Sequence, residues 1–203
     1  MQRLILATSV LSRRDLLKQL EIPFEEINCN IIEKEVDMEN EYSPYEWVKA
    51  ISSTKAHAVL NQVEGEAIII GADTIVTMIG RILHRPKNRE ECISMLTQLQ
   101  GKKHTVYTGL SVIYKHADGT YEEESYVDGA DVYMNHLSPK IIEAYADTDE
   151  PYDKAGGYAI HGKGALLIDT IYGDFFTVAG LPLRLFNKSL YKRGIDLVDF
   201  WKK

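Results

Sequence analysis

The hydrophobic positions of the chain follow two alternating periods, which predict strands interleaved with helices. Short runs of aliphatic and β-branched residues, bounded by turn residues, predict buried or half-buried strands. These strands lie at residues 4–7, 22–27, 66–76, 79–83, 105–114, 121–133 and 165–172. Stripes of apolar residues at helical spacing predict helices at residues 13–20, 43–62, 88–101, 138–145 and 181–193. Several strands are joined by hairpin turns, so we expect a mixed sheet flanked by helices.

Three of the predicted helices begin at a capping signal, in which a Ser or Asn precedes an acidic residue by three positions. The pairs are Ser12 with Asp15, Ser43 with Glu46, and Asn88 with Glu91. Pro44 and Pro139 directly follow serines, and proline favours the first turn of a helix. These signals predict helix starts near Arg13, Ser43, Asn88 and Ser138.

The stretch from Glu66 to Val76 places polar side chains inside a strongly apolar strand. Three consecutive isoleucines end at Gly71, and Asp73 and Thr74 then follow among apolar residues. A buried carboxylate is costly unless it is paired, hydrogen-bonded or bound to a metal. Gly71 removes a side chain at a point where another group must approach the backbone closely. Two interpretations remain open: Asp73 is a structural residue bonded to backbone N–H groups, or it is a catalytic group.

Two further segments offer positive charge to an anionic ligand. The first runs from strand 4–7 through Thr8–Arg14 into a helix, and it lacks the glycines of a P-loop. Backbone N–H groups and two arginines could hold a phosphate there; the alternative is a capped helix with two solvated arginines. The second is Lys55, which lies in the middle of the apolar stripe of helix 43–62. Its ammonium group either extends to solvent or contacts an anion, such as Asp73 or a phosphate.

Three loops carry further candidate residues. His84–Lys87 is a basic loop, and residues 149–164 contain four glycines within nine positions, close to Asp153, Lys154 and His161. Irregular glycine-rich loops often place polar groups near a ligand, although His161 could equally be a surface histidine. Residues 28–42 form an acidic segment that we expect to be a solvated loop, from which one acid could reach a metal.

Composition narrows the possible partners and the compartment. The 203 residues fit one domain or two small lobes, and 45% hydrophobic content supplies a core. A formal charge of −7 argues against binding a nucleic-acid backbone over a large surface, but a local basic pocket could still bind a small anion. Two isolated cysteines favour a reducing cytoplasm over a disulfide framework. No apolar run approaches the ~20 residues that span a bilayer, and no signal peptide is expected.

Several motifs together resemble the Maf family of nucleotide pyrophosphatases. The motifs are Leu6-Ala7 with Arg13, Leu16-Leu17, Lys55-Ala56, Gly71–Val76, Arg85-Pro86, His104–Val106, Glu150–Gly156 and Ala179–Pro182. The likeness covers nearly the whole chain with the motifs in the right order. It implies a single Maf-like domain over residues 1–203, with an elongated mixed α/β sheet flanked by helices. It also implies two lobes that share this sheet and a central cleft, as in inosine triphosphatases.

The resemblance further implies an activity, a cofactor and a site. The activity is hydrolysis of nucleoside triphosphates, such as dTTP, UTP or modified nucleotides, to a monophosphate and pyrophosphate in a house-cleaning role. The cofactor is Mg²⁺ or Mn²⁺, and the protein is expected to be a cytoplasmic homodimer with no nucleic-acid or membrane partner. The implied catalytic residues are Asp73, Lys55 and Arg85, and the implied metal ligands are Asp73 and Glu33. The implied substrate-binding residues are Thr8, Ser9, Ser12, Arg13, Arg14, Thr74, Asp153, Lys154 and His161.

Three departures from the family pattern leave the substrate open. The usual opening Ala-Ser-x-Ser-Pro-Arg-Arg is replaced, so that Ser12 stands where the first arginine is expected, and Arg14 could restore the charge. Arg85 replaces a lysine, and His161 stands where the pyrimidine-preferring branch has glutamine, although histidine cannot mimic both ends of an amide. Two alternatives therefore remain: a nucleotide-binding regulator of cell division without catalysis, or an enzyme for a modified purine such as 7-methyl-GTP.

Overall fold

The computed structural model describes residues 3–8, 10–29 and 42–201. They form a mixed seven-stranded sheet with the order β2-β1-β3-β5-β6-β7, in which β4 pairs with the end of β3. The chain divides into two compact units. The first unit is Met1–Asp73, Thr108–Asp128 and Gly180–Lys203, and the second is Thr74–Tyr107 and Gly129–Ala179. The predicted mixed α/β sheet flanked by helices is confirmed.

The first unit begins with three parallel strands: β2 (Glu25–Ile27), β1 (Arg3–Ala7) and the first part of β3 (Ala67–Met78). Parallel strands need both faces covered, and β1 and β3 are accordingly almost continuous aliphatic runs. Ala7 pairs with Gly71 on one side and with Ile27 on the other. The carboxyl ends of β1 and β2 therefore lie side by side, level with Gly71, where the parallel part of β3 ends.

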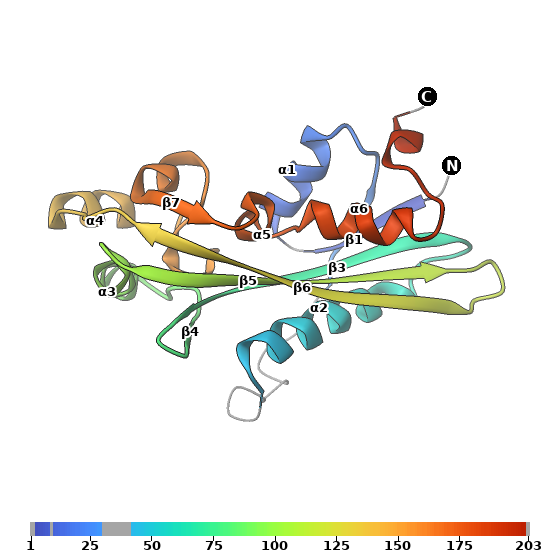
Figure 1. The fold of residues 1–203 in the computed structure, drawn as a ribbon, viewed down its shortest axis with the longest axis horizontal. Coiled ribbons are helices and arrows are strands. Elements are labelled where there is room, and N and C mark those ends of the chain that lie inside the picture. The colour runs from blue at the N-terminus through green and yellow to red at the C-terminus, as the bar shows by residue number, and fades with distance from the viewer. Residues whose placement is uncertain (1–2, 9, 30–41, 202–203) are drawn as a thin grey trace. The chain divides into compact units, whose positions relative to one another are not determined.

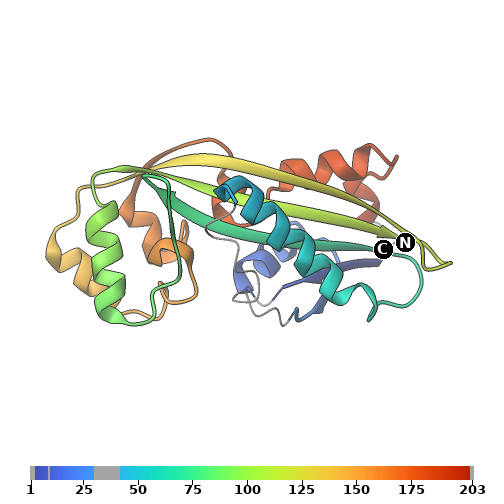
Figure 2. The ribbon, with the colours of Figure 1, turned by 90° about the horizontal axis from the view of Figure 1, so that it is seen from below.

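Helices cover both faces of the sheet in the first unit (Figures 1 and 2). Helix α2 (Pro44–Leu60) lies on one face, while α1 (Leu11–Gln19) and α6 (Leu183–Tyr191) lie on the other. Two glycines let α2 approach closely, because a Cβ on Gly71 would lie 2.3 Å from Ser52 O and one on Gly109 would lie 2.2 Å from Val48 O. The sequence predicted a close approach at Gly71, and the group that approaches is helix α2.

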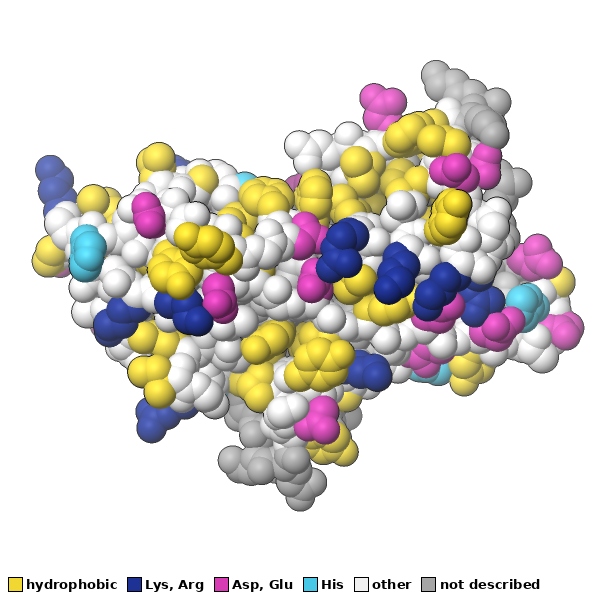
Figure 3. Space-filling model, viewed as in Figure 1, with side chains coloured by type: hydrophobic (Ala, Val, Ile, Leu, Met, Phe, Trp, Pro, Cys, Tyr) yellow, Lys and Arg dark blue, Asp and Glu magenta, His cyan; other side chains and the backbone are white. Residues whose placement is uncertain are grey.

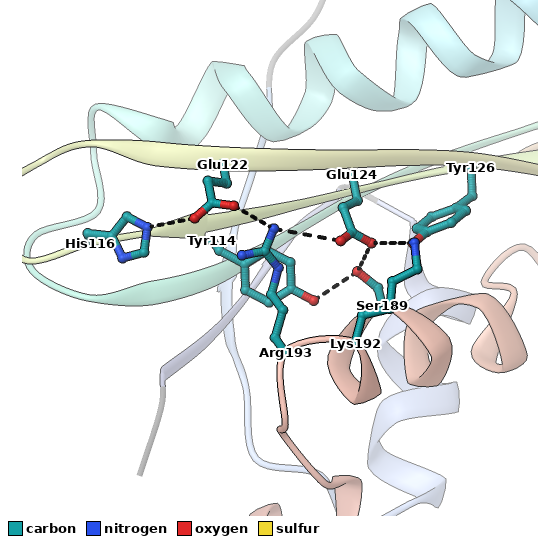
Figure 4. Close-up of polar contacts among 8 residues, drawn as sticks. All are labelled: Tyr114, His116, Glu122, Glu124, Tyr126, Ser189, Lys192 and Arg193. Carbon is teal, nitrogen blue, oxygen red and sulfur yellow. Dashed lines mark hydrogen bonds and ion pairs between the residues drawn. The ribbon is translucent and has the colours of Figure 1, made fainter.

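Helix α6 is attached to β5 (Lys103–Lys115) and β6 (Tyr121–Met134) by a polar network (Figure 4). Its members are Tyr114, His116, Glu122, Glu124, Tyr126, Ser189, Lys192 and Arg193. Ser189 Oγ donates to Glu124 at 3.0 Å and lies 2.8 Å from Tyr114 OH. Arg193 pairs with Glu122 at 2.9 Å and stacks 4.0 Å from the ring centroid of Tyr114. Figure 3 shows Lys and Arg side chains in a row on this face, with acidic side chains beside them. The network joins α6 and the two residues that follow it to strands β5 and β6.

The second unit contains the hairpin of β3 with β4 (Arg81–Leu83), the other halves of β5 and β6, and β7 (Ile168–Tyr172). Strand β7 runs antiparallel to β6. Helices α3 (Arg89–Leu99) and α4 (Pro139–Ala146) pack side by side, and the short helix α5 (Phe175–Ala179) ends the unit (Figure 2). The core gathers apolar side chains from these elements, including Val76, Leu96, Val132, Ile142 and Tyr158.

Two expectations about single elements were wrong, and one short helix was not predicted. Helix α1 begins at Leu11 and follows Val10, whose side chain cannot accept a hydrogen bond, so the predicted Ser12–Asp15 cap does not form the helix start. The predicted strand 165–172 begins only at Ile168, because Gly162–Leu167 forms a 3-10 turn, η3. Helix α5 was not predicted at all, since five residues are too few to show a helical period.

Strand β5 is more buried than its sequence pattern indicated. Its alternation predicted a half-buried strand, and its first half alternates as expected. From Thr108 to Tyr114 every side chain is buried, because α2 covers Gly109 on one face and α6 covers Tyr114 on the other. No helix among the described residues is long and apolar enough to cross a membrane.

Candidate active site

The candidate site of the first unit lies at the carboxyl ends of its parallel strands. Open α/β sheets bind ligands at this edge, because loops and helix N-termini converge there. Thr8 directly follows β1, is 1% exposed, and accepts a hydrogen bond from Val10 N at 3.0 Å through its hydroxyl. Its own N–H donates to Ile27 O at 3.3 Å, which ties the turn before α1 to the end of β2. Asp73 lies two residues beyond Gly71, the β3 partner of Ala7.

Lys55 and Asp73 form a buried ion pair with an Nζ–Oδ1 distance of 2.5 Å. Their side chains are only 7% and 10% exposed. The close packing of α2 on Gly71 brings the two residues together, because Lys55 directly precedes Ala56, which the added Cβ would meet. A buried ion pair gains little net stability once the desolvation of both charges is counted. Stability alone therefore does not explain why the pair is buried, and a functional site that uses its charges does.

Arg13 lies in the first turn of α1 and is 4% exposed. Its Nε donates to Gly180 O at 2.8 Å, so the guanidinium is anchored to the loop before α6. Gly180 has a φ of 101°, a conformation that favours glycine. Arg14 points elsewhere, with its Nε 3.5 Å from Asp15 Oδ1, while Ser12 is half-buried. The two arginines thus have different surroundings, and the buried one is Arg13.

Cys29 lies within the electrostatic influence of Lys55, Arg13 and Asp73. Cys29 was not identified from the sequence as part of this site. It is buried at 7% exposure and experiences the charges of Lys55, Arg13 and Asp73. Burial is the main cause that raises the pKa of its thiol, against the lowering effect of Lys55. The available signal was its place in the chain, two residues after the end of β2 at Ile27. Cys29 is thus influenced by Lys55, Asp73 and Arg13 together.

The candidate residues of the second unit come from two loops that lie against each other. Gly156 N donates to His84 O at 3.1 Å, and a Cβ on Gly157 would lie 3.4 Å from Pro86. Arg85 is exposed in the first loop. In the second loop, Lys154 pairs with the neighbouring Asp153. These contacts bring the predicted basic loop alongside the predicted glycine-rich loop.

His161 is exposed at the start of η3. The residues that shape this part of the loop are Glu150 and Tyr145, and sequence reasoning assigned neither of them. Glu150 accepts hydrogen bonds from Gly164 N at 2.8 Å and Lys163 N at 3.1 Å. Tyr145 OH lies 3.2 Å from the same carboxylate and accepts a bond from Ala159 N at 3.1 Å. Glu150 caps a turn that begins more than ten residues later in the chain. Local sequence patterns do not reveal such a contact.

The predicted residues thus fall into three groups. Thr8, Ser12, Arg13, Arg14, Lys55 and Asp73 lie in the first unit. The members that belong to the second unit are Thr74, Arg85, Asp153, Lys154 and His161. The predicted positions Ser9 and Glu33 lie outside the described residues.

The residues at Asp73 fit a divalent cation of the Mg²⁺ type. Magnesium usually binds one or two protein carboxylates and completes its shell with water and substrate phosphate oxygens. Asp73 offers one carboxylate, and the ammonium group of Lys55 lies beside it. Among the described residues no group of three or more His, Cys, Asp or Glu side chains forms an all-protein metal cage. The predicted second ligand, Glu33, is outside the described residues.

A parallel-strand edge with a buried carboxylate, lysine and arginine is typical of α/β proteins that bind a small anionic ligand there. The family is shown by sequence: the model of the Maf-like protein family matches residues 3–193, so the chain belongs to this family. The resemblance stated from the motifs is therefore confirmed.

Relatives with a stated activity match over nearly their whole length. A dTTP/UTP pyrophosphatase of Thermoanaerobacter sp. (strain X514) is 40% identical over 96% of this chain and 98% of its own. Proteins of the same name from Alkaliphilus oremlandii and Caldicellulosiruptor bescii are 43% and 42% identical, over 90% and 98% of this chain and 92% and 98% of their own. Among solved structures, the Ham1 protein of Staphylococcus aureus covers 95% of this chain and 100% of its own, at 13% identity and a TM-score of 0.45. The family is shown by the sequence matches.

Proposed function

We propose that the protein is a nucleoside triphosphate pyrophosphatase that converts a pyrimidine nucleotide of the dTTP or UTP type to its monophosphate and pyrophosphate. The observation that carries this proposal is the buried Lys55–Asp73 pair at the carboxyl ends of the parallel strands. Three relatives that span nearly the whole chain are named dTTP/UTP pyrophosphatases, which supports the same reaction.

In the proposed reaction a water molecule attacks the α-phosphorus, and the bond to the bridging oxygen of the β-phosphate breaks. Asp73 orients the water and accepts its proton, as a carboxylate within hydrogen-bond reach can do. Pyrophosphate leaves, and the nucleoside monophosphate keeps the new P–O bond. Asp73 is held in place for this role by its ion pair with Lys55.

The remaining candidates supply charge and recognition. Phosphoryl transfer needs charge neutralisation and alignment more than covalent chemistry. Lys55, Arg13, Arg85 and Lys154 are proposed to contact the phosphates, together with the turn at Thr8 and the first turn of α1. The proposed contacts to sugar and base come from Thr74, Asp153 and His161. Ser9, Ser12 and Arg14 complete the proposed phosphate-binding turn.

A divalent cation, Mg²⁺ or Mn²⁺, bound by Asp73 and Glu33, would supply positive charge to the phosphates and a more acidic water. The expected homodimer and cytoplasmic location are proposals as well. Cys29 and Cys92 are free and buried, which agrees with a reducing compartment. Sedimentation equilibrium at micromolar concentration tests the homodimer.

The proposed function is tested by a panel of nucleotides with pyrophosphate release as the readout. Wild type is incubated with dTTP, UTP, CTP, dGTP and 7-methyl-GTP in the presence of Mg²⁺ or Mn²⁺, and a parallel series contains EDTA. We expect metal-dependent release that is fastest with dTTP or UTP. Fastest release from 7-methyl-GTP would shift the substrate class to modified purines. Nucleotide binding by calorimetry without pyrophosphate release would instead support the regulator.

A further inference from the structure

Glu150 is hydrogen-bonded to the turn η3 (Gly162–Leu167) within the second unit. The carboxylate of Glu150 accepts hydrogen bonds from the first free N–H groups of η3, at Lys163 and Gly164. Such N–H groups at the start of a helical turn have no partner within the turn, so an acid from outside can cap them. Burial opposes ionisation, but these backbone bonds prevail and lower the pKa of Glu150.

The backbone around this carboxylate has little room to adopt another conformation. Gly162 has a φ of 63°, and a Cβ there would lie 2.9 Å from Glu150 Oε2. A Cβ on Gly164 would lie 2.3 Å from Ala159 O and 2.8 Å from Tyr145 OH. The chain from Ala159 to Gly164 is therefore wrapped tightly around the Glu150 carboxylate and the Tyr145 hydroxyl.

His161 lies inside this wrapped segment as the residue that precedes η3. Its backbone is extended, with φ −120° and ψ −179°, and its side chain is exposed. An exposed side chain can change rotamer, but the direction of its Cα–Cβ bond, and so the region that the ring can reach, is fixed by its backbone. The backbone that follows His161 is held by the bonds that Lys163 and Gly164 make to Glu150.

We infer that Glu150 is a positioning residue for base selection: it holds the segment that presents His161 to the base of the nucleotide. This inference rests on the proposed function, in which His161 contacts the base. A half-buried acid that only stabilised the loop would affect folding without changing the choice between bases. Glu150 acting through His161 changes that choice.

The test uses Glu150→Gln, which keeps the size of the side chain. Glutamine has one acceptor oxygen where glutamate has two, so one of the two backbone N–H groups meets an NH₂ donor. The readout is the ratio of kcat/KM for UTP to that for dGTP. We expect Glu150→Gln to lower this ratio about 10-fold, an effect within the range for a lost polar contact to a substrate. The matched control is Asp149→Asn, the same charge change at the exposed neighbouring residue, which should leave the ratio unchanged.

A double-mutant cycle with His161→Ala separates positioning from stability. In the His161→Ala background, Glu150→Gln should change the ratio less than two-fold, because the residue through which it acts is gone. An unchanged ratio in Glu150→Gln, or a full change that persists in the His161→Ala background, would overturn the inference. If wild type binds nucleotides without turnover, the proposed function fails and the same ratio is read from Kd values. If wild type binds neither nucleotide, both proposals fail.

Discussion

Each unit of the molecule buries one prominent pair of polar side chains, and the two pairs differ in charge and place. In the first unit Lys55 and Asp73 lie at the carboxyl ends of the parallel strands, 2.5 Å apart. In the second unit His104 Nε2 lies 2.6 Å from Tyr158 OH, and the two rings meet edge to face at 82°. His104 is 2% exposed and Tyr158 is 5% exposed, so both pairs are buried to a similar degree.

The difference between the pairs is that one consists of opposite charges and the other of neutral groups. Burial lowers the pKa of His104 to about 4 and raises the pKa of Tyr158, so both are uncharged near pH 7. Tyr158 packs among the apolar side chains of the second unit, whereas Asp73 lies in β3 two residues beyond Gly71, the partner of the last residue of β1. Burial alone therefore does not distinguish the proposed catalytic Asp73 from the His104–Tyr158 pair: what distinguishes it is its charge and its place beside the carboxyl end of β1.

Removing the lysine charge is expected to have the largest effect. Lys55→Met should lower kcat/KM by about 10²- to 10³-fold, the usual cost of one group that stabilises transition-state charge. Steady-state kinetics of pyrophosphate release with UTP and Mg²⁺ measures it. The matched control is Lys49→Met, on the exposed side of the same helix, which should retain wild-type kinetics. If Lys55→Met and Lys49→Met have the same kinetics, the charge of the Lys55–Asp73 pair has no part in the reaction.

The neutral pair predicts a pH dependence of stability. Unfolded histidine titrates near pH 6.5 and buried His104 near 4, so between these values the unfolded state binds one more proton. The free energy of unfolding should therefore fall as the pH drops from about 6.5 to about 4, by about 3 kcal/mol in total. Urea unfolding at a series of pH values measures this loss. Glu123 contributes below this window, because hydrogen bonds from serines and His57 outweigh burial and lower its pKa to about 2.

The contribution of His104 is isolated by His104→Gln, which removes the titrating ring. This variant should lack the decline between pH 6.5 and 4 whatever its stability at pH 7. His116→Gln, at an exposed histidine, should keep the decline. A decline that persists unchanged in His104→Gln would show that His104 is not the group responsible.

A change in the packing of α2 on β3 is expected to have the next largest effect, on both stability and activity. Gly71→Ala places a Cβ 2.3 Å from Ser52 O and 2.6 Å from Ala56 N, so α2 must move away from β3. We expect a loss of about 1–3 kcal/mol of stability together with reduced kcat/KM, because Lys55 moves with the helix. In the second unit, Gly129→Ala meets the Tyr107 ring at 2.9 Å, and a ring can rotate. That variant should lose less stability and no activity, as urea unfolding and kinetics would show.

The smallest effect is expected from Tyr158→Phe. The change removes the hydroxyl that bonds to His104 Nε2, and His104 Nδ1 has no hydrogen-bond partner among the described residues. The loss of one buried hydrogen bond should lower the free energy of unfolding by about 1 kcal/mol. Its kcat/KM should stay within two-fold of wild type. A large loss of activity would give the neutral pair a role in the reaction.

Local sequence signals predicted much of the fold. The caps at Ser43, Asn88 and Ser138 are confirmed, since each side chain accepts a hydrogen bond from the residue three positions on. The partnership of Lys55 with Asp73 was one of the predicted alternatives and is also confirmed. These predictions succeeded because a cap involves neighbours in sequence, and because a lysine in an apolar stripe needs an anion nearby.

Contacts between distant segments could not be predicted. The bond from Arg13 to Gly180 joins residues 167 positions apart, and Glu150 reaches Gly164 across 14 positions. Nothing in the local pattern of either segment encodes its partner. The start of α1 was mispredicted for a related reason, since the fold, and not the Ser12 side chain, decides where that helix begins.

Pyrophosphate release by Asp73→Asn is the most direct test of the claim that the charged pair carries the reaction. Asparagine keeps the shape of the side chain but cannot accept the proton of the attacking water. With UTP and Mg²⁺, the variant should lose about 10²- to 10⁴-fold in kcat, the range for a general base, while circular dichroism shows it folded. A folded Asp73→Asn protein that releases pyrophosphate as fast as wild type would contradict the account.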